Sequence, residues 1–180
     1  DPHNDLLVER VFDAWNRVDT ITRGGVTEDL DYSPDGTLAG RTDGNLNTTR
    51  YSYDAFRRLT STERIGQVTT TLIYDTHGNT LSVTDPEGHT TGYGYDDLGN
   101  QLQQDSPDSG ITRYVHDEAG QLVGQTDASG QYSSVGYDAA GRVSAIDREG
   151  PDYDVHYVYD NCANGLGRLC EVTTGWGHSI

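Results

Sequence analysis

The sequence contains no lysine and no methionine, and it is poor in apolar residues. All 12 basic residues are arginines, set against 29 aspartates and glutamates, which gives a formal net charge of −17. Phosphate binding needs clustered basic side chains, and anionic membranes attract the same groups. The composition therefore argues against nucleic acid and against anionic membrane surfaces as partners.

Long apolar runs are also missing. No stretch of about 18 apolar residues and no signal peptide is present, so we expect no membrane insertion. Hydrophobic residues make up 33% of the chain, a level that with this charge is typical of disorder. However, the chain has 12 tyrosines, and its apolar residues are periodic, which favours a folded protein with a shallow core. Without a starting methionine, the chain is expected to be an internal piece of a longer protein.

A tyrosine recurs at a nearly constant interval. Tyr53 lies 21 residues after Tyr32 (53−32), and the last interval is 22 residues. Such a period predicts a repeat architecture. The recurring positions are Tyr32, Tyr53, Tyr74, Tyr95, His116, Tyr137 and Tyr159.

Each of these positions ends a predicted strand. Tyr93 and Tyr95 alternate, as do Tyr51 and Tyr53, and alternation with period two indicates a β-strand with one apolar face. We expect the tyrosine rings to stack between neighbouring repeats and form the core, with their hydroxyls partly in water. The apolar residues of the second strand, which include Leu81 and Leu102, are expected on the same face.

A tight turn is predicted directly after each tyrosine. Aspartate at the first turn position can accept hydrogen bonds from backbone N–H groups further along, and glycine at the last position takes positive φ. The aspartates are Asp54, Asp75, Asp96, Asp117, Asp138 and Asp160, and the glycines are Gly78, Gly99, Gly120 and Gly141. Arg57 replaces the glycine of one copy, so a changed turn type or strain is expected there.

The second strand of each copy is expected to end in another turn. These turns are predicted at Asp43-Gly44, Asp85–Gly88, Asp105–Gly110, Asp127–Gly130 and Asp147–Gly150. The predicted fold is all-β: antiparallel β-hairpin repeats that form a curved, solenoid-like meander. One array should fill residues 1–180, with an irregular copy at 1–29, regular copies at 30–156 and a variant copy with a long loop at 157–180.

The motif Tyr-x-Tyr-Asp-x-x-Gly-Arg-Leu/Val resembles the repeats of the Rhs/YD-repeat family. The segment Tyr137–Val143 is the cleanest match, and Tyr159–Leu169 is similar to a variant bacterial repeat. The resemblance implies a structural, non-enzymatic segment of a hollow β-shell in a secreted or cell-surface bacterial protein. It also implies neighbouring repeats of the parent protein and an enclosed toxic domain as partners.

No residue pattern predicts a catalytic, metal or cofactor site. Most aspartates fall at turn positions, no Asp-x-Asp-x-Asp-Gly calcium loop occurs, and the histidines do not cluster in sequence. His116 is interpreted as a stacked structural ring in place of a tyrosine. The sequence therefore predicts no enzyme and no cofactor.

Cys162 and Cys170 flank the lengthened loop of the last copy. In an exported protein such a pair favours a disulfide, whereas two reduced thiols are the alternative in a chain that stays in the cytoplasm until delivery.

A second functional hypothesis is a carbohydrate- or cell-surface-binding adhesion module with exposed tyrosines. The isolated array should also leave unpaired strand edges, which favour association with further copies.

Overall fold

The computed structural model describes residues 8–64, 69–149 and 154–175, and it contains only strands and turns there. The strands are β1 (Val8–Phe12), β2 (Val18–Arg23), β3 (Val26–Tyr32), β4 (Leu38–Thr42), β5 (Thr48–Tyr53), β6 (Leu59–Arg64), β7 (Thr70–Tyr74), β8 (Thr80–Thr84), β9 (Thr90–Tyr95), β10 (Gln101–Ser106), β11 (Gly110–His116), β12 (Leu122–Thr126), β13 (Tyr132–Tyr137), β14 (Val143–Arg148), β15 (Val155–Tyr159) and β16 (Leu169–Thr174). Among the described residues, no helix is long and apolar enough to cross a membrane.

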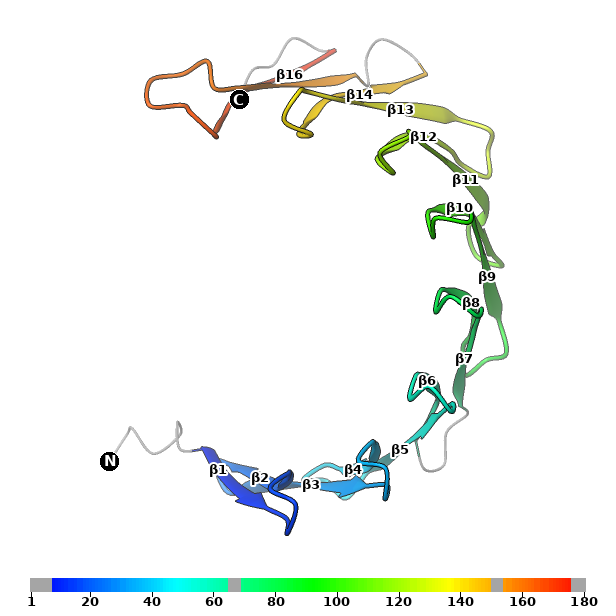
Figure 1. Cartoon of the computed structure of the whole chain (residues 1–180), viewed down its shortest axis with the longest axis vertical. Coiled ribbons are helices and arrows are strands. Elements are labelled where there is room, and N and C mark those ends of the chain that lie inside the picture. Colours follow the sequence, from blue (N-terminus) through cyan, green and yellow to red (C-terminus); the bar gives the residue numbers. More distant parts are fainter. Residues whose placement is uncertain (1–7, 65–68, 150–153, 176–180) are drawn as a thin grey trace. The chain divides into compact units, whose positions relative to one another are not determined.

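The chain divides into two compact units, Asp1–Thr90 and Thr91–Ile180. Within each unit, the strands lie side by side in the order of the chain, which Figure 1 colours from β1 in blue to β16 in red. Within each unit, consecutive strands pair antiparallel. The prediction of all-β hairpin repeats is therefore confirmed, while the subdivision at residues 30 and 157 remains a prediction.

The ladder shifts register by one residue at each repeat tyrosine. In the hairpin of β7 and β8, Ile73 pairs with Ser82 but Tyr74 pairs with Thr80. A tight turn with glycine in the left-handed region produces such a bulge. The same shift occurs at Tyr32, Tyr53, His116, Tyr137 and Tyr159, and at Gln101 opposite Tyr95.

The structure does not contain the buried tyrosine core that the sequence suggested. No hydrophobic side chain among the described residues is fully buried. The six tyrosines of the repeat position and His116 are half-buried. A single sheet with no second layer has nothing to cover its faces, so burial comes only from neighbours along the sheet.

The apolar face is also less continuous than expected. Leu59 pairs directly with Tyr53, but in the next two copies Thr80 and Gln101 occupy that place. Leu81 and Leu102 stand one residue further on, and a shift of one residue moves a side chain to the other face of a strand. They are 41% and 42% exposed, so their expected position on the tyrosine face is wrong.

Of the turns predicted at the other ends of the hairpins, Asp85–Gly88 and Asp127–Gly130 are confirmed, and two others differ in detail. At Asp43–Asn47 the left-handed residue is Leu46, with φ 65°, and not Gly44. In the turn after β10, Ser106 pairs with Gly110, so the turn begins one residue later than expected. The turn predicted at Asp147–Gly150 includes Gly150, which lies outside the described residues.

Candidate functional site: the repeat turns, the arginine bridges and the long loop

The repeat aspartates shape the turns through their carboxylates. In the turn after β7, Asp75 Oδ1 accepts hydrogen bonds from the N–H groups of His77 and Asn79, both at 2.8 Å. Both backbone hydrogen bonds of this turn also involve Asp75, since its N–H donates to Asn79 and its carbonyl accepts from Gly78. The same carboxylate pattern recurs at Asp54, Asp96, Asp117 and Asp138.

Gly78, Gly99, Gly120 and Gly141 all have positive φ, between 75° and 100°. Arg57 occupies the equivalent position with φ 62°, so that copy keeps the turn geometry and an arginine takes the left-handed conformation. L-residues with a Cβ pay a steric cost in this region. The alternative that this turn changes type is therefore wrong.

The arginine four residues after the turn aspartate connects successive copies. In the copy of Asp138, Arg142 Nε donates to Asp138 Oδ2 at 2.7 Å, and Arg142 Nη2 donates to Asp160 Oδ2 at 2.6 Å. Its Cζ lies 4.3 Å from the centre of the Tyr159 ring. Such an arrangement combines ion pairing with a cation–π contact. We call this group an arginine bridge.

Two further arginine bridges lie in the first unit. Arg17 binds Asp13 and lies over Tyr32, with its Cζ 4.3 Å from the ring centre. Arg58 binds Asp54, lies over Tyr74 and donates to the Asp75 carbonyl at 2.8 Å. The sequence analysis did not assign these arginines a role, although their shared position, four residues after the turn aspartate, is visible in the sequence.

These contacts change the pKa values of the groups involved. Hydrogen bonds from the Arg142 backbone and then from its guanidinium lower the pKa of Asp138. The guanidinium of Arg142 is also the main cause of the lowered pKa of Asp160. Both carboxylates are therefore held in the charged form that the bridge requires.

The tyrosine hydroxyls are bound to backbone carbonyls of the preceding copy. Tyr74 donates to the carbonyl of Leu59 at 2.8 Å, and Tyr137 donates to that of Leu122 at 2.8 Å. Tyr32 makes the equivalent bond to Val18 at 2.9 Å. The hydroxyls were expected to lie partly in water; for these three tyrosines, each hydroxyl also links two repeats through a part-buried hydrogen bond.

His116 stands where a tyrosine stands in the other copies. Its ring is half-buried, and its Nδ1 is buried without a hydrogen-bond partner. A pocket of about 320 Å³ lies beside it, lined by Gln101, Gln104, Tyr114, His116 and Leu122. An imidazole is shorter than a phenol ring, which accounts for the loss of the link made by the tyrosine hydroxyls.

The loop between β15 and β16 departs from the regular turns. Cys162 and Cys170 form a disulfide with their Cα atoms 5.4 Å apart. Asp160 Oδ1 accepts a hydrogen bond from Gly167 N–H at 2.6 Å, seven residues on, in place of the usual cap. Leu166, at 92% exposed, projects from this loop. The sequence predicted the longer loop and gave the disulfide as one of two alternatives, which the structure confirms, but it did not predict the bond from Gly167 to Asp160.

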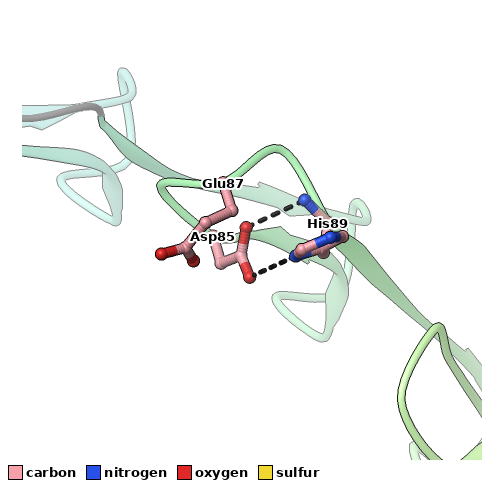
Figure 2. Close-up of side chains that lie close together, drawn as sticks. All are labelled: Asp85, Glu87 and His89. Carbon is pink, nitrogen blue, oxygen red and sulfur yellow. Dashed lines mark hydrogen bonds and ion pairs between the residues drawn. The ribbon is translucent and has the colours of Figure 1, made fainter.

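One group of side chains has the composition of a metal site. Asp85, Glu87 and His89 lie in the turn between β8 and β9, with one potential ligand atom of each within 4.8 Å of the others (Figure 2). Asp85 Oδ1 accepts a hydrogen bond from the His89 N–H at 2.8 Å, and Asp85 Oδ2 lies 3.1 Å from His89 Nδ1. These are the capping contacts of an ordinary turn, and both Glu87 and His89 are exposed. The turn alone accounts for this arrangement.

The comparisons with known proteins agree on the repeat. Residues 74–111 and 116–152 match the RHS repeat family model. A crystal structure of TcdB2-TccC3-Cdc42 is similar with a TM-score of 0.72 and 18% identity, over 87% of this chain and 10% of that one. A structure of TcdB2-TccC3 gives 0.71 and 17%, over 93% and 11%. A third, of TcdB2-TccC3 without its hypervariable C-terminal region, gives 0.65 and 17%, over 88% and 9%.

At these identities the similarity concerns the fold, and this chain spans about a tenth of the length of those structures. No curated protein matches the sequence. The period, the capped turns and the matched segments give the same assignment. Residues 74–111 and 116–152 carry RHS repeats, the repeats of the Rhs/YD-repeat family.

Proposed function

We propose that the chain is a non-catalytic wall segment of a β-shell that encloses a toxic cargo domain of a secreted bacterial protein. The observation that carries the proposal is the repeated use of the same residues for the same structural contacts. Aspartates cap turns, arginines bridge copies and tyrosine hydroxyls bind the preceding copy. These contacts join each repeat to the next and so extend the sheet, as a structural shell segment requires.

Containment would follow from the hydrogen-bonded sheet and its charge. Consecutive described strands in each unit pair through backbone hydrogen bonds, which join them into a continuous surface. The formal charge of −17 keeps the surfaces hydrated. The partners in this proposal are the neighbouring repeats of the parent protein and the enclosed domain, and the location is outside the producing cell.

Proteolysis of the secreted parent protein, with an epitope tag in its cargo domain, tests containment. Ile146 of β14 pairs with Val135 on one side and with Val155 on the other, so Ile146→Pro should open the sheet. We expect faster cleavage of the cargo in Ile146→Pro and an unchanged rate in the matched control Ile146→Val. If the wild-type parent protects its cargo no better than Ile146→Pro does, the containment proposal fails.

A binding function has one observation in its favour. A pocket of about 440 Å³ lies between the first two repeat turns, lined by Trp15, Arg17, Tyr32, Ser33, Pro34, Asp35 and Gly36. Trp15 is 76% exposed, and exposed aromatic faces with nearby polar groups suit the apolar face of a sugar. Glycan-array binding by wild type that is lost in Trp15→Ala, at unchanged melting temperature, would favour the adhesion function. Absence of binding would leave containment as the function.

A further inference from the structure

The loop from Asp160 to Arg168 contains two residues other than glycine in the left-handed region. Asp160 has φ 66° and Asn164 has φ 56°, and both are L-residues in the left-handed region. Residues in this region persist only when surrounding contacts hold them there. In the regular turns a single aspartate and one glycine achieve this, but here three separate contacts do so.

The disulfide is the first of these contacts. Cys162 N–H lies 3.1 Å from Cys170 Sγ, and Gly165 N–H donates to the Cys162 carbonyl at 2.8 Å. Gly165 is buried against the disulfide, since a Cβ there would lie 2.8 Å from Cys162 Sγ and 2.9 Å from Cys170 Sγ. The middle of the loop therefore packs directly on the two sulfur atoms.

Asp160 and Arg142 supply the second and third contacts. Asp160 binds Gly167 N–H through Oδ1 and the guanidinium of Arg142 through both oxygens. These contacts hold the base of the loop to the preceding copy, whereas the disulfide holds its middle. Loss of the disulfide would leave Gly165, the residue after the left-handed Asn164, without the sulfur atoms that it packs on.

The disulfide is also positioned for a local effect. Cys162 is exposed, so a small dithiol can reach it. The cysteines are eight residues apart, and Cys170 lies in β16 at the bulge between Leu169 and Glu171. The paired residues of β15 and β16, from Val155 and Thr174 to Tyr159 and Leu169, include neither cysteine. Reduction should therefore release the loop and leave the hairpin paired.

We propose that the Cys162–Cys170 disulfide is a redox-sensitive clasp of this loop. A dithiol reductant transfers two electrons: the S–S bond breaks, the two sulfurs take up the two thiol protons of the reductant, and the reductant becomes a disulfide. The released loop leaves its left-handed conformation and opens around Leu166. The proposal concerns the loop alone and does not depend on an enclosed cargo.

Trypsin provides a direct test, because Arg168 lies in the loop and is exposed. Three samples are compared: the untreated protein, protein reduced with dithiothreitol, alkylated and freed of reagents, and the variant with Cys162→Ser and Cys170→Ser. We expect cleavage after Arg168 to be about tenfold faster in the last two, since ring closure restricts the loop. Cleavage after Arg57, in a turn without cysteine, is the internal control and should not change.

Each outcome decides the proposal. Equal cleavage at Arg168 in untreated and reduced protein would overturn it, as would two alkylatable thiols in untreated protein. Faster cleavage at both Arg168 and Arg57 would show unfolding of the array instead of a local release. If the double serine variant does not fold, hydrogen exchange of the Gly167 amide in untreated and reduced wild type gives the same comparison.

Discussion

Arg142 lies over the ring of Tyr159, with its Cζ 4.3 Å from the ring centre, while it binds the carboxylates of Asp138 and Asp160. One side chain thus joins the turn of one repeat to the ring and the turn of the next. In a sheet without a buried core, such lateral contacts replace packing between layers as the source of specific structure.

We expect Arg142→Ala to lower the melting temperature, because it removes the ion pairs and the ring contact together. Arg142→Lys should recover only part of the loss, since a lysine ammonium cannot bind two carboxylates through a planar fork. The control is Arg113→Ala on β11, an exposed arginine outside the bridges. Thermal denaturation followed by circular dichroism measures all three variants, and equal effects of Arg142→Ala and Arg113→Ala would contradict the role of the bridge.

The tyrosine hydroxyls should contribute separately from the rings. Tyr74→Phe keeps the ring under Arg58 but removes the hydrogen bond to the Leu59 carbonyl. A bond of this kind contributes about 1 kcal/mol, and we expect that loss in the free energy of unfolding. Tyr132→Phe, at a position 43% exposed, is the comparison. Identical urea unfolding curves for Tyr74→Phe and wild type would show that the bond adds nothing.

The left-handed turn position predicts opposite effects at two sites. Arg57→Gly should stabilise the protein by up to about 1 kcal/mol, because glycine avoids the steric cost of φ 62°. Gly78→Ala should destabilise it by about 1 to 2 kcal/mol, because φ is 100° there. No neighbouring atom lies within 4 Å of the added Cβ, so the backbone conformation alone would cause the loss. Equilibrium unfolding of both variants measures the changes, and effects of the same sign would contradict the assignment.

The capping carboxylates make stability sensitive to acid. The folded-state pKa of Asp138 is lowered by hydrogen bonds from the backbone and guanidinium of Arg142. The stabilisation is therefore complete above the ordinary aspartate pKa of about 3.9, and it is lost as the pH falls through the lower folded-state value. Asp138→Asn should melt below wild type at pH 7, and this difference should shrink below about pH 4. A difference that stays constant down to pH 2.5 would count against the capping role; this pH is roughly one unit below the ordinary value.

The sequence predicted the features that repeat locally. Alternation, the aspartate at the start of each turn and the glycine at its end depend on residues at most four positions apart, so one copy contains the information. The period then placed Tyr74 and Asp75 in the same roles as Tyr137 and Asp138. Hairpins, turn positions and the sign of φ at Gly141 follow from these local rules.

Contacts between copies could not be predicted from the residues of one copy. Whether Arg58 faces Tyr74 depends on the register across two strands and a bulge, which composition does not specify. For the same reason, the face on which Leu81 and Leu102 lie could not be predicted. Each stands one residue after the residue that pairs with the repeat tyrosine, and a shift of one residue moves a side chain to the other face of the sheet. The repeat tyrosines are only half-buried because the described strands have no second layer to cover them, which a repeat period alone does not reveal.

The four-residue span of the turn caps bears on how this chain is made. The carboxylate of Asp75 needs only His77 and Asn79 to close its turn. A hairpin can therefore form as soon as it leaves a ribosome or an export channel, before the rest of the chain has emerged. Contacts between residues so close in sequence favour fast folding. Growth from one end, copy upon copy, is the order of assembly that this construction allows.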